Sequence, residues 1–148
     1  MDNVLHLLGI ARKAGRVEVG EEPVGASARA RQARLILVAS DAADNSARRA
    51  AHFAQAGKAP WFRVPYTKGE LGGTVGRASC AMLALTDVGL AAALLSRLAA
   101  GAPETYGAAS AELSEKADKA LQRQKEQRRH EKNCLLYTSP SPRDRSLS

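Results

Sequence analysis

The sequence predicts an α/β fold in which three layers, α-β-α, form around a mixed sheet of about four strands. Short apolar runs alternate along the chain with segments of helical periodicity, a pattern typical of a sheet with helices on both faces. The chain has 148 residues, of which 45% are hydrophobic, so it can bury one substantial core. Aromatic residues make up only 4%, and we therefore expect Ala, Leu and Val to form most of that core.

The N-terminal part of the chain predicts two helices joined by a short extended piece. The first helix spans residues 3–14, because apolar residues recur there at helical spacing and a glycine follows as a stop signal. Residues 16–19 form the extended piece. The second helix spans residues 21–32: it opens at Gly20, carries acidic residues in its first turn and tolerates Pro23 there.

The next segment predicts a strand, a helix and another strand. Residues 34–39 (RLILVA) are an apolar run of the length of a buried strand. Residues 44–56 form a third helix, which we expect Asp44 to cap and Gly57 to close. Residues 61–64 form the third strand.

The most informative stretch is KGELGGTVGRASCAMLALTDVG, which starts at Lys68. It predicts a short helix at 68–75, a turn of small residues at 76–80 and a buried strand at 81–86, before a final helix at 87–99. A small-residue loop at the head of a buried strand lets another molecule's backbone or a flat base come very close. Apart from Cys80 the loop offers no acid, base or nucleophile, so it indicates a binding edge rather than a catalytic one.

The polar C-terminal extension is expected to lie outside the domain, which we place at residues 1–100. Residues 101–133 carry mixed charge and scattered apolar positions, so they predict a solvated helix or a disordered tail. A solvated tail is the favoured interpretation. The alternative is a tail that lies along RNA through its basic residues, Arg123, Lys125, Arg128 and Arg129.

The composition changes abruptly at Cys134. Codons that encode residues Cys134 to Asp144 can be chosen so that the nucleotide string resembles a common transposase-type sequencing-library adapter. We therefore expect residues 134–148 to be adapter read-through, with the natural C-terminus missing, and give Cys134 no functional weight. Resequencing the source locus tests this expectation.

Charge narrows the choice of partner. The net charge of +7 and the pI near 9.8 favour a polyanion, nucleic acid more than an anionic membrane face. No basic and apolar leader follows Met1, and no apolar run approaches the roughly 20 residues that span a bilayer, so we expect a cytoplasmic protein. Cys80 and Cys134 are too few for a disulfide framework or a metal site, and we expect no cofactor.

Catalytic patterns are weak. No nucleophilic triad surrounds the histidines, which are His6, His52 and His130. Helix capping accounts for the aspartates near element ends, which are Asp41, Asp44 and Asp87. One alternative remains: Ser40-Asp41 follows a strand, where α/β enzymes keep ligands, so a small phosphate-ligand enzyme stays open. The glycines at 72, 73 and 76 lack the Lys-Ser/Thr of a P-loop and precede their strand.

Four segments resemble, in order and at unchanged spacing, the kink-turn-binding ribosomal protein family (L-seven-Ae, in the superfamily of L-thirty-e, S-twelve-e and Gadd-forty-five), in particular its small bacterial members. The resemblance covers about the first hundred residues. The matching segments are LLGIARKAGRVEVGEE at 7–22, ARLILVASDAADN at 33–45, PYTKGELGGTVG at 65–76 and RASCAMLALTDVGLA at 77–91. The family's fold is the same three-layer sandwich.

The resemblance implies a non-catalytic protein that binds kinked RNA, an asymmetric internal loop flanked by sheared G·A pairs. Ribosomal RNA, the ribosome and other structured RNAs are the implied partners; neither DNA nor a membrane is expected. The implied RNA-binding residues lie on the N-terminal part of the second helix and on the loop before the last strand. They are Gly20, Glu21, Glu22, Gly25, Ala26 and Arg29 on the helix, and Arg77, Ala78, Ser79 and Cys80 on the loop.

The resemblance also implies roles for these residues. The backbone N–H groups of Gly20 and Glu21 would face RNA as an anion site, and Glu22 would accept hydrogen bonds from guanine. Arg77 would stack on a base or pair with a phosphate, and Ser79 would bond an exposed base edge. Further phosphate contacts would come from Arg29, Arg31, Lys13 and Arg16.

Two positions depart from the family. Ala26 stands where the family has a lysine, and Glu21 adds a second acid beside Glu22. The departure predicts a variant RNA or weaker binding. It also leaves a protein-interaction module of the same fold open as an alternative.

Overall fold

In the computed structural model, the backbone is described for residues 3–138 and the side chains for residues 3–127. The expectations for Arg128, Arg129 and His130, and for adapter read-through at 139–148, lie outside these ranges. Helices and strands alternate along the chain. They are α1 Asn3–Lys13, β1 Val17–Val19, α2 Glu21–Arg29, β2 Leu35–Val38, α3 Asp44–Gly57, β3 Trp61–Arg63, α4 Lys68–Thr74, β4 Met82–Leu85, α5 Val88–Gly101 and α6 Pro103–Thr138.

The sheet is mixed and has four strands in the order β1-β4-β2-β3. Strand β4 pairs antiparallel with β1 and β2, and β2 pairs parallel with β3. Val38 at the end of β2 therefore lies opposite Met82 at the start of β4. The segments that leave β1, β2 and β3 meet the loop that enters β4 at one end of the sheet, which we call the Met82 end.

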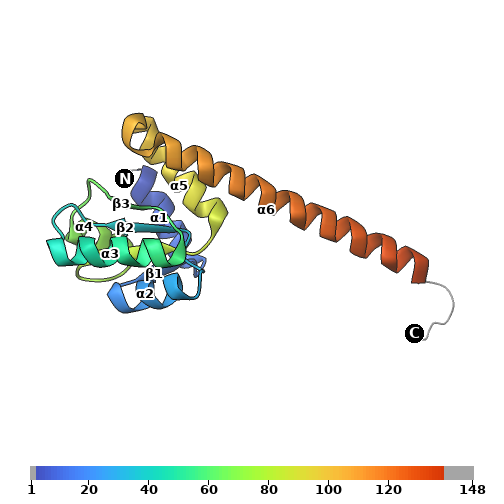
Figure 1. The fold of residues 1–148 in the computed structure, drawn as a ribbon, viewed down its shortest axis with the longest axis horizontal. Coiled ribbons are helices and arrows are strands. Elements are labelled where there is room, and N and C mark those ends of the chain that lie inside the picture. The colour runs from blue at the N-terminus through green and yellow to red at the C-terminus, as the bar shows by residue number, and fades with distance from the viewer. Residues whose placement is uncertain (1–2, 139–148) are drawn as a thin grey trace. The chain divides into compact units, whose positions relative to one another are not determined.

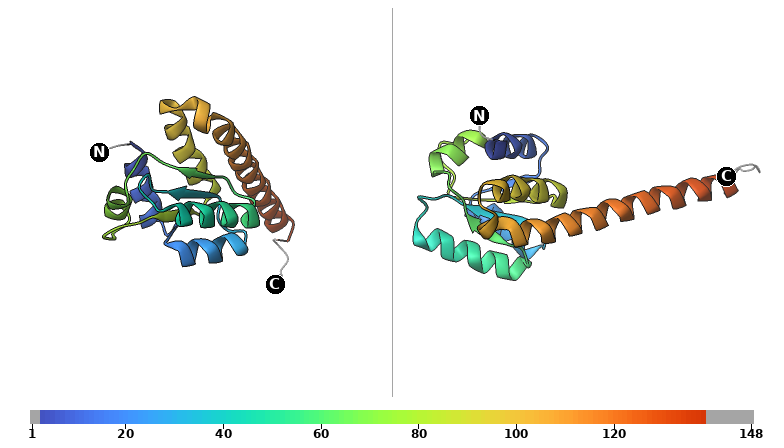
Figure 2. Two further views of the ribbon diagram at one scale, coloured as in Figure 1. Left: turned by 60° about the vertical axis from the view of Figure 1, so that its left-hand side comes forward. Right: turned by 90° about the horizontal axis from the view of Figure 1, so that it is seen from above.

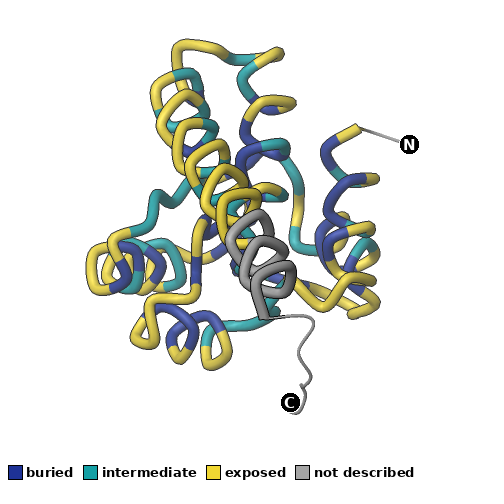
Figure 3. The backbone as a smooth tube through the Cα atoms, turned by 90° about the vertical axis from the view of Figure 1, so that its right-hand side faces the viewer, coloured by how far each residue is buried: buried dark blue, intermediate teal, exposed yellow. Residues whose placement is uncertain are grey.

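Helices cover both faces of the sheet, as the α/β prediction required. α2 and α3 pack together on one face, and α1 and α5 pack together on the other (Figures 1 and 2). Every residue of β2 and β4 is buried, because these central strands are covered on both sides. Figure 3 shows buried and exposed stretches alternating along the helices, as expected of helices that pack one face on a core. The apolar runs of the sequence thus form the core of an α-β-α sandwich.

The end of α2 differs from the prediction. The helix stops at Arg29 instead of residue 32, because Arg31 adopts a left-handed conformation with φ of 59°. The N–H of Gln32 then bonds to the carbonyl of Ser27 at 2.9 Å. Residues other than glycine adopt positive φ uncommonly, and an arginine gives no sign of it. The sequence therefore could not indicate that α2 ends here.

Helix α3 begins at residue 44 as predicted, but the capping roles expected of Asp44 and Gly57 were wrong. Ala43 is the N-cap residue and makes no side-chain cap bond, so Asp44 is the first helical residue, where its charge favours the helix N-terminus. Gly57 lies inside the helix, and Lys58 takes the left-handed C-cap conformation with φ of 54°. A Cβ on Gly57 would lie 2.8 Å from the carbonyl oxygen of Ala28, so this glycine allows α3 to approach α2.

The expected cap of α5 is confirmed. The Asp87 carboxylate accepts the N–H of Leu90 at 2.9 Å. Helix α4 has a capping box that the sequence analysis missed: the Thr67 hydroxyl accepts the Glu70 N–H at 3.1 Å, and the Glu70 carboxylate accepts the Thr67 N–H at 3.0 Å. These bonds fix the start of the short α4.

The chain divides into two compact units, Met1–Ser114 and Glu115–Ser148. The first unit continues past the expected domain end at residue 100, because Tyr106 and Leu113 are buried in it. The rings of Tyr106 and Phe62 lie 5.0 Å apart between centroids. In the second unit the residues from Glu115 to Gln127 are helical, and none of them is buried. Among the described residues, no helix combines the length and the apolar character needed to cross a membrane.

Candidate nucleic-acid interface

The two surfaces expected from the sequence adjoin each other at the Met82 carbonyl. The N–H of Gly20, just before α2, donates to this oxygen at 3.0 Å. The thiol of Cys80, at the end of the loop, donates to the same oxygen at 3.2 Å. The start of α2 and the loop at 77–80 are therefore held side by side at the Met82 end of the sheet.

The loop is built directly on Gly72 of α4. A Cβ on Gly72 would lie 2.7 Å from the Ser79 Cα and 2.9 Å from the Arg77 carbonyl oxygen. The Arg77 N–H donates to the Gly72 carbonyl at 2.7 Å, and the Cys80 N–H donates to the Lys68 carbonyl at 2.9 Å. Both ends of the loop are thus fixed to α4.

Three of the four loop residues are exposed: Arg77, Ala78 and Ser79. Their side chains are small except for that of Arg77, so a flat group approaching the loop meets mostly backbone. Cys80 is 3% exposed, and its side chain supports the loop from the core. A ligand at this surface would touch the first three.

Burial raises the pKa of the Cys80 thiol above its ordinary value of 9.0, and a backbone hydrogen bond at Met82 and the charge of Arg77 offset part of the rise. The unfolded thiol therefore ionises at lower pH than the folded one. The stabilisation is complete below pH 9.0 and is lost as the pH rises through that value towards the folded pKa. Urea unfolding from pH 7 to 10 should show a steeper loss of stability in the wild type than in Cys80→Ala. Equal slopes would remove Cys80 as the cause.

The α2 surface has both open and covered positions. Glu22, Ala26 and Arg29 are exposed, whereas Gly25 is buried. A Cβ on Gly25 would lie 2.9 Å from the Cζ of Phe53 and 3.3 Å from an Arg29 guanidinium nitrogen. Gly25 therefore serves the packing of α2 on α3.

A cavity of about 440 Å³ lies along this helix pair. Four of the residues expected on the α2 surface line it, together with two residues of α3. They are Glu21, Glu22, Gly25 and Arg29 of α2, and Arg49 and Phe53 of α3. Sequence reasoning missed both α3 residues; their spacing of four places them on one helix face, but nothing in the sequence shows which helix that face meets.

Gly20 differs from its expected role, and the side chain of Glu21 is engaged by α3. The Glu21 carboxylate accepts from the Ser46 hydroxyl at 3.1 Å and from the Arg49 guanidinium at 2.7 Å, so α3 holds both of its oxygens. The Gly20 N–H is used by Met82 and is not available to an anion. Their places in the interface stay predictions.

The other expected phosphate contacts are dispersed. The carbonyl of Arg16 accepts the N–H of Thr86, which puts Arg16 at the end of the sheet opposite Met82. Arg31 lies beyond the C-terminus of α2, away from Gly20.

Arg12, a residue not expected at the site, is nearer the loop: its guanidinium lies 2.7 Å from where a Cβ on Gly76 would be. Gly76 has φ of 75°, so it also provides the turn that starts the loop.

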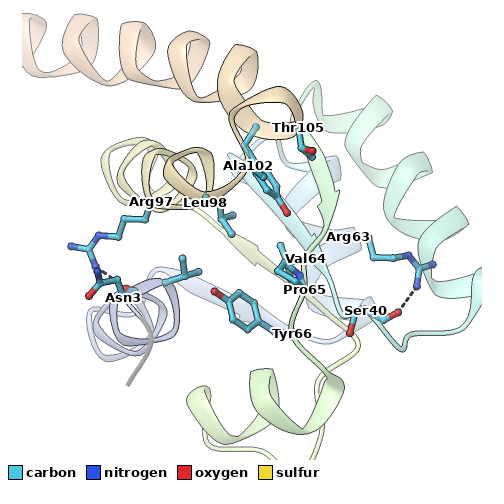
Figure 4. A pocket seen from close by; sticks show the side chains of 13 residues that line it. Asn3, Ser40, Arg63, Val64, Pro65, Tyr66, Arg97, Leu98, Ala102 and Thr105 are labelled. Carbon is cyan, nitrogen blue, oxygen red and sulfur yellow. Dashed lines mark hydrogen bonds between the residues drawn. The ribbon is translucent and has the colours of Figure 1, made fainter.

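A larger cavity, about 710 Å³, lies in the first unit between α1, α5 and the segment after β3 (Figure 4). Its two arginines are engaged with backbone: Arg97 donates to the Asn3 carbonyl at 2.8 Å, and Arg63 donates to the Ser40 carbonyl at 3.1 Å. Figure 4 shows both guanidinium groups at the outer edges of the cavity.

Ser40 lines the larger cavity, but the carboxylate of the neighbouring Asp41 bonds elsewhere. The Asp41 carboxylate accepts the Lys68 N–H at 2.8 Å and so caps α4. A phosphate-ligand enzyme would need the Asp41 carboxylate beside its ligand. Because this carboxylate bonds to α4 instead, the structure weakens the enzyme alternative. The described part of the chain contains no group of three or more His, Cys, Asp or Glu residues placed to hold a metal ion.

Together, the fold and the adjoining surfaces define a small α-β-α sandwich protein with a loop-and-helix face at one end of its sheet. No family model matches the chain. Over 96 residues it is 35% identical to the RNA-binding protein YlxQ of Bacillus subtilis (strain 168), an alignment that spans 62% of this chain and 91% of that protein. The chain belongs to the same family as YlxQ.

A solved structure shows the same fold. It is a protein of unknown function from Bacillus halodurans C, 24% identical, with a TM-score of 0.61. The match covers 66% of this chain and 97% of that one.

Proposed function

We propose that this protein binds structured RNA of the kink-turn type and is not an enzyme. The observation that carries the proposal is the shared Met82 carbonyl, which joins the α2 N-terminus to the exposed loop. The family relationship to an RNA-binding protein supports the same class of ligand. We further propose a cytoplasmic protein whose RNA partner is ribosomal RNA or another kinked RNA.

The chemistry of the two surfaces fits a bend in RNA. A kinked internal loop presents unpaired base edges and a splayed nucleotide, which regular A-form helix does not. The exposed loop lets a flat base approach its backbone, with Arg77 available for stacking and Ser79 for hydrogen bonding. The exposed Glu22 carboxylate on α2 would accept from guanine N–H groups on the other side of the bend.

Arg77→Glu tests the loop half of the proposal. It replaces an exposed cation by an anion, so the affinity for a kink-turn RNA should fall by about tenfold or more while the fold stays intact. Filter binding and a thermal melt measure the two effects. Arg34→Glu is the matched control: it makes the same charge change at an exposed residue next to the opposite end of the sheet, since the Arg34 N–H bonds to the Leu85 carbonyl. Equal losses for both variants would reduce the effect to overall charge.

Ala26→Lys tests the helix half. Ala26 is exposed on the same face as Glu22, one turn away, so a lysine there needs no repacking. It should strengthen binding to a standard kink-turn by about threefold to tenfold through one added phosphate contact. No gain would mean that this helix face does not meet the RNA.

A further inference from the structure

Arg49 on α3 lies outside the residues expected from the sequence and stands beside the start of α2. Its guanidinium lies 2.7 Å from the Glu21 carboxylate, and its side chain is 64% exposed. It lines the 440 Å³ cavity with Glu22 and Arg29, residues of the proposed α2 surface. A cation from a neighbouring helix therefore stands beside this surface.

Charge explains why a cation is needed there. Of the four charged residues that line the cavity, two are acidic and two are basic: Glu21, Glu22, Arg29 and Arg49. Without Arg49, the start of α2 would present two carboxylates against one guanidinium and would repel phosphate. The lysine that the family resemblance leads one to expect at Ala26 is absent and offers no compensation.

The arrangement also leaves Arg49 able to bind. Guanidinium has five N–H donors, and the recorded bond to Glu21 uses only Nη1. The Ser46 hydroxyl bonds the other Glu21 oxygen, so the carboxylate that holds Arg49 is itself held in place. An exposed ion pair of this kind is weak, so sharing Arg49 with a phosphate costs little.

We infer that Arg49 of α3 contacts an RNA phosphate beside the start of α2, where it serves in place of the missing lysine at Ala26. The inference rests on the proposed function and deepens it by assigning a binding residue outside the surfaces that the sequence indicates. Glu21 is then the residue that positions Arg49.

The test titrates the full chain with a kink-turn RNA at several salt concentrations. Arg49→Ala should weaken binding by about tenfold and reduce the slope of log affinity against log salt by about one. Arg48→Ala is the matched control, because Arg48 is also exposed on α3 but points about 100° away around the helix. It should leave both quantities near the wild-type values.

A second variant separates binding from a structural role. Arg49→Ala combined with Ala26→Lys should regain most of the lost affinity, because the cation returns on the facing helix. A purely structural effect would lower the melting temperature of Arg49→Ala, leave the salt slope unchanged and resist this rescue; that result overturns the inference. If the wild type binds the RNA but Arg49→Ala binds equally well, the inference alone fails. If the wild type does not bind, both the inference and the proposed function fail.

Discussion

Gly72→Ala should displace the loop at 77–80 and abolish most of the affinity for kinked RNA. The added Cβ would lie 2.7 Å from the Ser79 Cα and 2.8 Å from the Ser79 nitrogen, and backbone atoms cannot rotate away as a side chain does. The hydrogen bond between the Arg77 N–H and the Gly72 carbonyl would be strained by the same shift. We expect the unfolding free energy to fall by about 1–3 kcal/mol. The RNA affinity should fall further than this loss of stability explains, because the displaced loop is part of the binding surface.

Gly73→Ala is the control for this effect. It lies next to Gly72 in α4, is exposed, and a Cβ there meets no atom within 4 Å. It should stabilise the helix by about 0.5–1 kcal/mol and leave RNA affinity unchanged. Urea unfolding and RNA titration of the pair measure both quantities. A Gly72→Ala protein that behaves like Gly73→Ala would show that the loop does not depend on this contact.

Gly57→Ala should destabilise the packing of α3 against α2. Its Cβ would lie 2.8 Å from the carbonyl oxygen of Ala28 and 3.2 Å from the Ala28 Cα, so α2 and α3 would have to move apart. We expect about 1–3 kcal/mol of destabilisation, which lowers the melting temperature by several degrees.

The control here is Gly107→Ala, a helical glycine in α6 with no atom within 4 Å of the added Cβ. It gains helix propensity without a clash and should melt at or above the wild-type temperature. If Gly57→Ala also melts at or above the wild-type temperature, the close approach of α3 to α2 does not constrain this position.

Much of the fold was predictable because the signals are local. The apolar runs at residues 34–39 and 81–86 have the length of buried strands, and β2 and β4 lie within them. The stop of α2 was not predictable, since it depends on Arg31 in a left-handed conformation that glycine usually supplies. Gly57 was misassigned because a glycine that ends a helix and a glycine that admits a neighbouring helix look alike in sequence.

The candidate site was predictable in outline. The exposed loop residues and the start of α2 follow from composition and from the family resemblance. The sequence could not show contacts between elements, such as the close approach of Gly72 in α4 to the backbone of the loop at 77–80. Likewise, Arg49 and Phe53 join the α2 surface only because α3 packs beside it.

Recognition of kinked RNA by this protein is best tested by titrating the full chain against two RNAs. One is a standard kink-turn; the other is the same RNA with its sheared G·A pairs replaced by Watson–Crick pairs. We expect tight binding to the kink-turn and weak, salt-sensitive binding to the control. Equal affinity for both RNAs would contradict kink-turn recognition. A basic surface would then explain the binding, and the loop-and-helix face would not distinguish kinked from regular RNA.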